Sequence, residues 1–124
     1  MAIKDYHELR VYNMAFDSAM AIFHLSKSWP SEERYSLTSQ IRRSSRSICA
    51  NLAEAWRKRR YPAAFVAKMS DADTEAGETI VWLDFALKCE YLPESKYCEL
   101  KEAYNYICAQ LVTMINQSEK WCMA

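Results

Sequence analysis

Residues 36–60 read SLTSQIRRSSRSICANLAEAWRKRR, and this stretch decides the fold. At about 100° per residue, five apolar side chains fall within about 60° of one another: Leu37, Ile41, Ile48, Leu52 and Ala55. A second sector of similar width, well separated from the first, holds Arg42, Arg46, Arg57 and Arg60. The stretch is therefore predicted to form a helix that buries its apolar face in a core and carries a basic face elsewhere.

Few helix breakers interrupt the rest of the chain, which has one glycine and three prolines in 124 residues. Apolar residues that recur every three or four positions predict helices over about 7–28, 32–59, 63–89 and 94–120, with Ser31 capping the second helix. Short links between long helices imply antiparallel neighbours. The predicted fold class is all-α, an antiparallel up-down-up-down four-helix bundle in which residues 1–124 form a single domain.

The helical stripes also predict which side chains face the core. In the first helix the predicted stripe is Leu9, Tyr12, Phe16, Ala19 and Phe23. Three of the four tryptophans fit the primary stripes less well, namely Trp56, Trp82 and Trp121. Large aromatic residues away from a core stripe are typical of a subunit interface, whereas stacking on single-stranded bases is the alternative.

Charge is balanced over the whole chain but unevenly distributed along it. Between Arg42 and Arg60 there are seven basic residues and one acidic residue, whereas Tyr61–Ala124 holds five basic and ten acidic residues. The candidate residues for binding the phosphate backbone of RNA or DNA are Arg42, Arg43, Arg46, Arg57, Lys58, Arg59 and Arg60.

A second interpretation of these basic residues involves no ligand. The first three arginines would pair with an acidic stripe, within or between subunits, because the arginine fork bonds carboxylates well; that stripe is Asp71, Glu75 and Glu78. The cluster at Arg57–Arg60 would then be a solvated helix end that the helix dipole favours.

Nothing in the composition predicts catalysis. The five cysteines form no C-x-x-C pair, so we expect reduced thiols and no zinc site. The two histidines, His7 and His24, have no partner at a spacing that suggests a metal site or a catalytic base. We predict no enzyme activity, no cofactor, no metal and no small-molecule substrate. The absence of an apolar leader or membrane span predicts a cytoplasmic protein with no membrane partner.

Four motifs carry a family resemblance. Residues 9–15 (LRVYNMA) are similar to L-x-V-W-x-x-A, with Tyr12 in place of tryptophan, and residues 30–43 (PSEERYSLTSQIRR) match P-x-x-E-x-x-x-L-x-x-Q-[IL]-R-R. Residues 47–55 (SICANLAEA) match S-[IV]-x-x-N-[IL]-A-E-G, with Cys49 where proline is frequent and Ala55 replacing glycine. Residues 75–83 (EAGETIVWL) look like E-x-x-E-T-x-x-W-L.

Over nearly its whole length the chain resembles the bacterial four-helix bundle family of proteins encoded in intervening sequences of large-subunit ribosomal RNA genes. These proteins were once mislabelled as ribosomal, and the accessory protein of diversity-generating retroelements looks like a relative. The resemblance implies the bundle fold, a homopentamer and no established enzyme activity. The retroelement relative binds nucleic acid and a reverse transcriptase through basic surfaces, and Arg42 and Arg43 lie within a shared motif.

Two functions follow as expectations. The first is a non-catalytic oligomeric protein that binds RNA or DNA through the basic face of the second helix. The alternative is a protein-interaction scaffold without nucleic-acid binding, in which the arginines hold subunits together. Candidate subunit contacts are Glu75, Glu78, Trp56 and Trp82.

Overall fold

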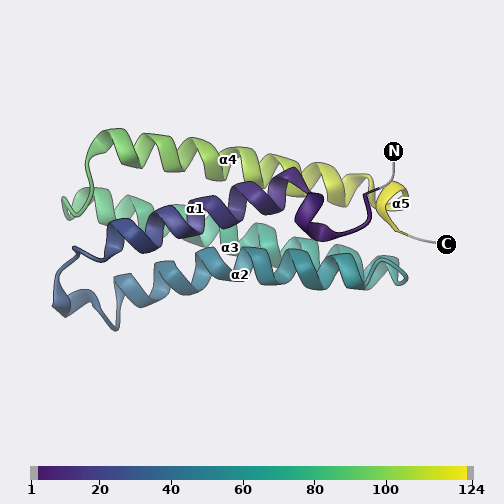
Figure 1. The fold of residues 1–124 in the computed structure, drawn as a ribbon, viewed down its shortest axis with the longest axis horizontal. Coiled ribbons are helices and arrows are strands. Elements are labelled where there is room, and N and C mark those ends of the chain that lie inside the picture. The colour runs from purple at the N-terminus through teal and green to yellow at the C-terminus, as the bar shows by residue number, and fades with distance from the viewer. Residues whose placement is uncertain (1–2, 123–124) are drawn as a thin grey trace.

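The computed structural model describes residues 3–122, and all its regular elements are helical. The four long helices are α1 (Arg10–Ser26), α2 (Leu37–Arg57), α3 (Pro62–Lys88) and α4 (Glu94–Asn116). Three short elements complete the chain, namely the 3-10 turns η1 (Tyr6–Glu8) and η2 (Ser31–Glu33) and the helix α5 (Ser118–Trp121). Figure 1 shows the long helices side by side, each antiparallel to the next. The predicted all-α, up-down-up-down four-helix bundle is confirmed.

The long helices form a closed ring around one core. The α2–α3 pair has the most extensive contact, followed by α3–α4, α1–α2 and α1–α4, and within the described residues no diagonal pair of long helices brings Cα atoms within 8 Å of each other. The α1–α2 and α3–α4 connections lie at one end of the bundle (Figure 1). The α2–α3 turn, η1 and α5 gather at the other end.

The core confirms the predicted stripe of the second helix. Ile41, Ile48 and Ala55 are completely buried, and Leu37 and Leu52 are buried as well. These residues meet buried side chains of α3 and α4, namely Phe65, Met69, Ala72, Ala76, Leu83, Leu100, Tyr104, Ile107, Leu111 and Met114. The spacing of apolar residues therefore identified the inner face of α2.

The stripe predicted for the first helix is wrong in part. Phe16 was expected in the core, but it is 48% exposed. Val11, Ala15 and Ile22 face the core instead, on a sector that lies about 120° from Phe16 around the helix. Small side chains at the inner face allow α1 to pack close to its neighbours, while its aromatic side chains extend along the flank of the bundle.

Helix boundaries differ from the prediction where a 3-10 turn precedes a helix. The second helix was expected from residue 32 with Ser31 as its cap, but Ser31 begins η2 and α2 begins at Leu37. Ser36 has φ −128° and ψ −101°, which is outside the helical region. In the same way, α1 begins at Arg10 after η1, and α4 ends at Asn116 rather than near residue 120.

A glutamate from the preceding turn caps α2. Glu33 Oε1 accepts hydrogen bonds from Ser36 Oγ at 2.6 Å and from the Leu37 amide at 3.2 Å. Its other carboxylate oxygen accepts a hydrogen bond from Tyr91 Oη at 2.8 Å. The carboxylate therefore satisfies an amide at the start of α2 and also joins the α1–α2 connection to the α3–α4 turn.

These hydrogen bonds perturb both titrating groups. The bond from Ser36, followed by the bonds from Tyr91 and Leu37, lowers the pKa of Glu33 below its ordinary value of 4.5. The bond to Glu33, together with desolvation, raises the pKa of Tyr91 to about 12. Because the bond needs an ionised Glu33 and a protonated Tyr91, it stabilises the fold across the intervening pH range.

A buried hydroxyl pair lies in the α2–α3 interface. Ser44 and Thr79 are both completely buried, and Ser44 Oγ lies 2.8 Å from Thr79 Oγ1. Thr79 Oγ1 is also within hydrogen-bond distance of the Glu75 carbonyl at 2.8 Å, and Ser44 Oγ lies 3.3 Å from the Ile41 carbonyl. Each hydroxyl therefore has a partner inside its own helix as well as across the interface.

We expect Ser44→Val to destabilise the protein by about 2 kcal/mol, because extra methyl groups overpack the contact and the cross-helix bond is lost. Ser44→Ala should cost about 1 kcal/mol, since Thr79 keeps its bond to the Glu75 carbonyl. Urea unfolding measures both values. The control is Ser39→Ala on the exposed face of α2, and a Ser44→Val protein as stable as the wild type would contradict the interpretation.

Tyr91→Phe should lower the unfolding temperature at pH 7. The difference from wild type should shrink as pH falls through the lowered pKa of Glu33, and again as pH rises from 10 towards about 12. Thermal unfolding across a pH series tests this window. Tyr35→Phe is the matched control, because Tyr35 is 87% exposed; a pH-independent difference for Tyr91→Phe would refute the assignment.

Candidate nucleic-acid interface on the second helix

One outward face of α2 carries a line of arginines with only small side chains between them. Arg42, Arg46 and Arg57 lie within about 60° around the helix axis, and Ala50 and Ala53 fall in or beside the same sector. We call these five residues the basic strip. Arg46, Ala50 and Arg57 are exposed, and the other two are half-buried. The strip runs about 22 Å along the helix from Arg42 to Arg57.

The first half of the strip borders an open groove of about 630 Å³. Its lining includes Arg34, Thr38, Arg42, Arg43 and Arg46. Arg34 was not predicted as a candidate; it precedes α2 and joins the groove because the chain turns at Ser36. In the sequence Arg34 occupies a variable position of the P-x-x-E-x-x-x-L motif, and nothing there distinguishes it from an ordinary surface arginine.

Two arginines of the strip rest on one aromatic ring of α1. The Arg42 guanidinium lies 4.9 Å from the centroid of the Phe23 ring, and that of Arg46 lies 5.6 Å from it. Arg42 Nε also donates a hydrogen bond to Ser26 Oγ at 2.9 Å, and Arg42 Nη2 donates to the Phe23 carbonyl at 3.4 Å. Arg42 is thus anchored between two helices, whereas Arg46 is held by the ring alone and faces solvent.

Arg43 is the one arginine of this set that pairs with the predicted acidic stripe within the described chain. Its Nη2 lies 2.8 Å from Glu78 Oε1 and 3.6 Å from Glu75 Oε1. Trp82 Nε1 donates to the same Glu78 oxygen at 3.3 Å. Arg43, Glu75, Glu78 and Trp82 therefore form one cluster between α2 and α3. The predicted ion pairing applies to Arg43, and its charge is largely neutralised locally.

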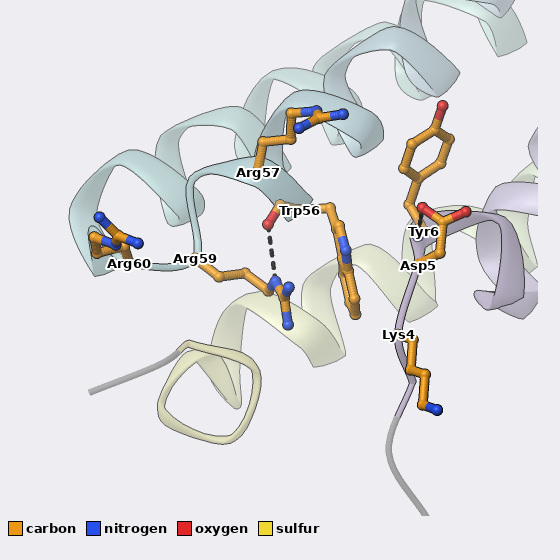
Figure 2. Close-up of a pocket in the computed structure, with 7 residues that line it drawn as sticks. All are labelled: Lys4, Asp5, Tyr6, Trp56, Arg57, Arg59 and Arg60. Carbon is orange, nitrogen blue, oxygen red and sulfur yellow. Dashed lines mark hydrogen bonds between the residues drawn. The ribbon is translucent and has the colours of Figure 1, made fainter.

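The second basic group surrounds a pocket of about 420 Å³ at the end of the bundle, which we call the end pocket (Figure 2). Its lining comes from residues 4–6, which lead into η1, and from the last residues of α2 and the turn after it: Lys4, Asp5, Tyr6, Trp56, Arg57, Arg59 and Arg60. Lys58 is exposed and does not line the pocket. No ion pair within 4.0 Å involves Arg57, Lys58, Arg59 or Arg60 in the described residues.

Trp56 lies inside the subunit rather than on its surface. It is only 7% exposed and belongs to the core cluster. The Arg59 guanidinium lies 3.5 Å from the centroid of its ring, and Arg59 Nε donates a hydrogen bond to the Trp56 carbonyl at 2.8 Å (Figure 2). Little of the Trp56 side chain is therefore left for the predicted subunit contact.

Exposed apolar side chains gather where the start of α2 meets the second half of α3. Tyr35 is 87% exposed, Phe85 55% and Val81 46%. Tyr35 and Phe85 line a hollow of about 370 Å³ together with Trp82. We call Tyr35, Val81, Trp82 and Phe85 the apolar patch. Of these four residues only Trp82 was predicted from the sequence, as a large aromatic residue off the core stripe; Tyr35, Val81 and Phe85 were not.

The cysteines and the possible metal-binding side chains form no reactive site in the described residues. Burial raises the pKa of both Cys49 and Cys108 to about 11, so these thiols are protonated at neutral pH. All five cysteines are free. Within residues 3–122 no three His, Cys, Asp or Glu side chains gather in a way that could hold a metal ion. None of the helices in that range is long and apolar enough to span a membrane.

Residues 7–113 match the family described as 23S rRNA-intervening sequence protein. The chain belongs to this family. The resemblance carried by the four motifs is confirmed, since the match covers all of them.

A solved structure shares both sequence and fold. It is the crystal structure of a protein with unknown function from the S23 ribosomal protein family of Bacteroides thetaiotaomicron, and it is 30% identical in sequence with a TM-score of 0.77. The match covers 86% of this chain and 95% of that chain. No curated protein sequence matches the chain. Neither the family description nor the description of that structure names an enzymatic activity.

Proposed function

We propose that this protein is a non-catalytic assembly protein that binds RNA or DNA through the basic strip of α2. The observation that carries the proposal is the pair Arg46 and Arg57, two exposed guanidinium groups on one helix face with only alanines between them. A strip of about 22 Å is long enough to contact several phosphates of a nucleic acid. Small side chains between the arginines let a phosphate backbone lie close to the helix.

The support from Phe23 favours binding over mere solvation of the charges. Arg42 and Arg46 are both placed over the Phe23 ring, which restricts their rotamers before a ligand arrives. Ordering a long side chain costs about 0.5–1.5 kcal/mol on binding, so guanidinium groups that are already placed lose less. Arg43 contributes less to this surface because Glu78 and Glu75 neutralise it.

Self-association would strengthen such a surface. We propose that the apolar patch is a contact between copies of the chain, with the pentamer that the resemblance implies as the expected assembly. Phe85 and Tyr35 are large, exposed side chains that line one hollow, and contiguous exposed apolar surface is typical of protein–protein contacts. Several copies of one basic strip on a single assembly would raise the affinity for a long nucleic acid through avidity.

A scaffold without nucleic-acid binding is the second candidate, and the Arg43–Glu78 ion pair favours it. That contact shows that an arginine of α2 can serve packing between helices rather than a ligand. Under this alternative the basic strip would meet acidic side chains of another copy or of a partner protein, and its loss would break the assembly.

The double variant Arg46→Gln/Arg57→Gln separates the two candidates. We expect the dissociation constant for short RNA and DNA strands to rise about tenfold, and the slope of log affinity against log salt to fall by about 1–2, because two phosphate contacts are lost. Fluorescence anisotropy across a salt series measures both quantities. Lys88→Gln/Lys120→Gln removes two exposed charges elsewhere and should change neither by a comparable amount.

Light scattering in the same buffer gives the assembled mass. An intact assembly of the wild type that binds no strand at low salt would refute nucleic-acid binding and leave the scaffold. A smaller assembly in the Arg46→Gln/Arg57→Gln protein would assign these arginines to subunit contacts.

For the apolar patch we expect Phe85→Lys to reduce the assembled mass while the helical circular dichroism stays unchanged, because a charge would be placed in an apolar contact. Tyr61→Lys is the matched control, since Tyr61 is 61% exposed and lies outside the patch. An unchanged mass for Phe85→Lys would contradict the assignment of the patch to self-association.

A further inference from the structure

The end pocket differs from the basic strip in shape and in the way its charges are held. We propose that it binds a phosphate monoester, the group found at a phosphorylated end of a nucleic-acid strand, whereas the strip contacts the phosphodiester backbone. This inference rests on the proposed nucleic-acid function and assigns a different ligand group to a pocket that shares only Arg57 with the basic strip. The observation behind it is the fixed guanidinium of Arg59 inside a basic pocket at the end of the bundle.

Arg59 is oriented by two contacts that leave its fork open. Its Nε donates a hydrogen bond to the Trp56 carbonyl at 2.8 Å. Its guanidinium carbon lies over the Trp56 ring, 3.5 Å from the ring centroid. Trp56 is buried, so this support is rigid. The terminal amino groups of Arg59 have no hydrogen-bond partner within the described residues. They form the planar donor pair that binds two oxygens of one phosphate.

The balance of charge in the end pocket suits a dianion. Lys4, Arg57, Arg59 and Arg60 contribute four positive charges, and Asp5 contributes one negative charge. The Asp5 carboxylate is already engaged, because it accepts hydrogen bonds from the Tyr6 amide at 3.0 Å and from the His7 ring at 2.6 Å. A phosphate monoester carries about 1.5 to 2 negative charges at pH 7, more than one backbone phosphodiester.

The shape of the pocket favours binding of the end of a nucleic-acid strand over binding of a continuous strand. A running backbone needs an open path on both sides, as the groove beside Arg42 and Arg46 provides. The end pocket is instead bounded by the segment Lys4–Tyr6 on one side and by the end of α2 on the other (Figure 2). Its volume of about 420 Å³ lies within the range of small-ligand pockets, about 300–1,000 Å³. It therefore has room for a terminal nucleotide as well as its phosphate.

A free mononucleotide also carries a phosphate monoester, so the test includes both strand ends and free mononucleotides as ligands. Anisotropy is measured with RNA and DNA 12-mers labelled at one end, with the other end carrying either a phosphate or a hydroxyl. Both the 5′ and the 3′ end are tested in this way. Adenosine monophosphate and inorganic phosphate are then used as competitors.

For the wild type we expect about tenfold tighter binding of strands phosphorylated at one of the two ends, the gain of a bidentate charge-assisted contact. Arg59→Gln should abolish this preference, and Arg59→Lys should restore only part of it because lysine has no fork. Lys58→Gln is the matched control, since it removes the neighbouring charge outside the pocket and should keep the preference.

Because Arg59 covers the core residue Trp56, the circular dichroism of the Arg59 variants is compared with wild type. Arg60→Gln, which changes an exposed residue of the pocket, should weaken the preference independently. Equal affinity of the wild type for phosphorylated and unphosphorylated strands, or a preference retained in folded Arg59→Gln, would overturn the inference while leaving binding by the strip intact. Binding of adenosine monophosphate without binding of any strand would uphold the phosphate monoester site and refute the proposed function.

Discussion

The close pairing of α2 with α3 is the constraint on which the rest of the structure depends. Ser44 and Thr79 are completely buried at this contact, with their hydroxyl oxygens 2.8 Å apart. Since the side chains there are small, the two helices approach closely, and neither hydroxyl is left without a partner. The contact sets the rotation of α2 about its own axis. That rotation turns Ile41 and Ile48 into the core and leaves Arg46 facing solvent.

Arginines that look equivalent along α2 have different environments as a result. Arg43 faces α3 and pairs with Glu78, whereas Arg42 bridges to Ser26 of α1. An exposed ion pair adds only about 0–1 kcal/mol to stability, so the main effect of the Arg43 contact is to cancel charge locally. The positive surface is thus displaced towards the α1 side and the C-terminal end of α2. A charge count along the sequence weights all seven basic residues equally and does not reveal this asymmetry.

Both ends of the bundle are organised by polar contacts between segments that are far apart in the chain. Helix ends leave amide and carbonyl groups without partners, so polar side chains collect there. At one end Glu33 caps α2 and accepts a hydrogen bond from Tyr91, which lies 58 positions away. At the other end the segment beginning at Lys4 meets the end of α2 beside Arg59. The long faces provide packing, and the ends provide the defined polar sites.

The sequence by itself determined the helical class, the approximate extent of each long helix and the family, because a 3.6-residue apolar period and short motifs are local properties. It also determined that α2 has an apolar and a basic face. Only the tertiary structure decided that Phe16 lies outside the core, that α2 begins at Leu37, and that Trp56 is buried beneath Arg59. Each depends on a neighbouring helix or a distant segment, and local periodicity carries no information about which neighbour covers a given face.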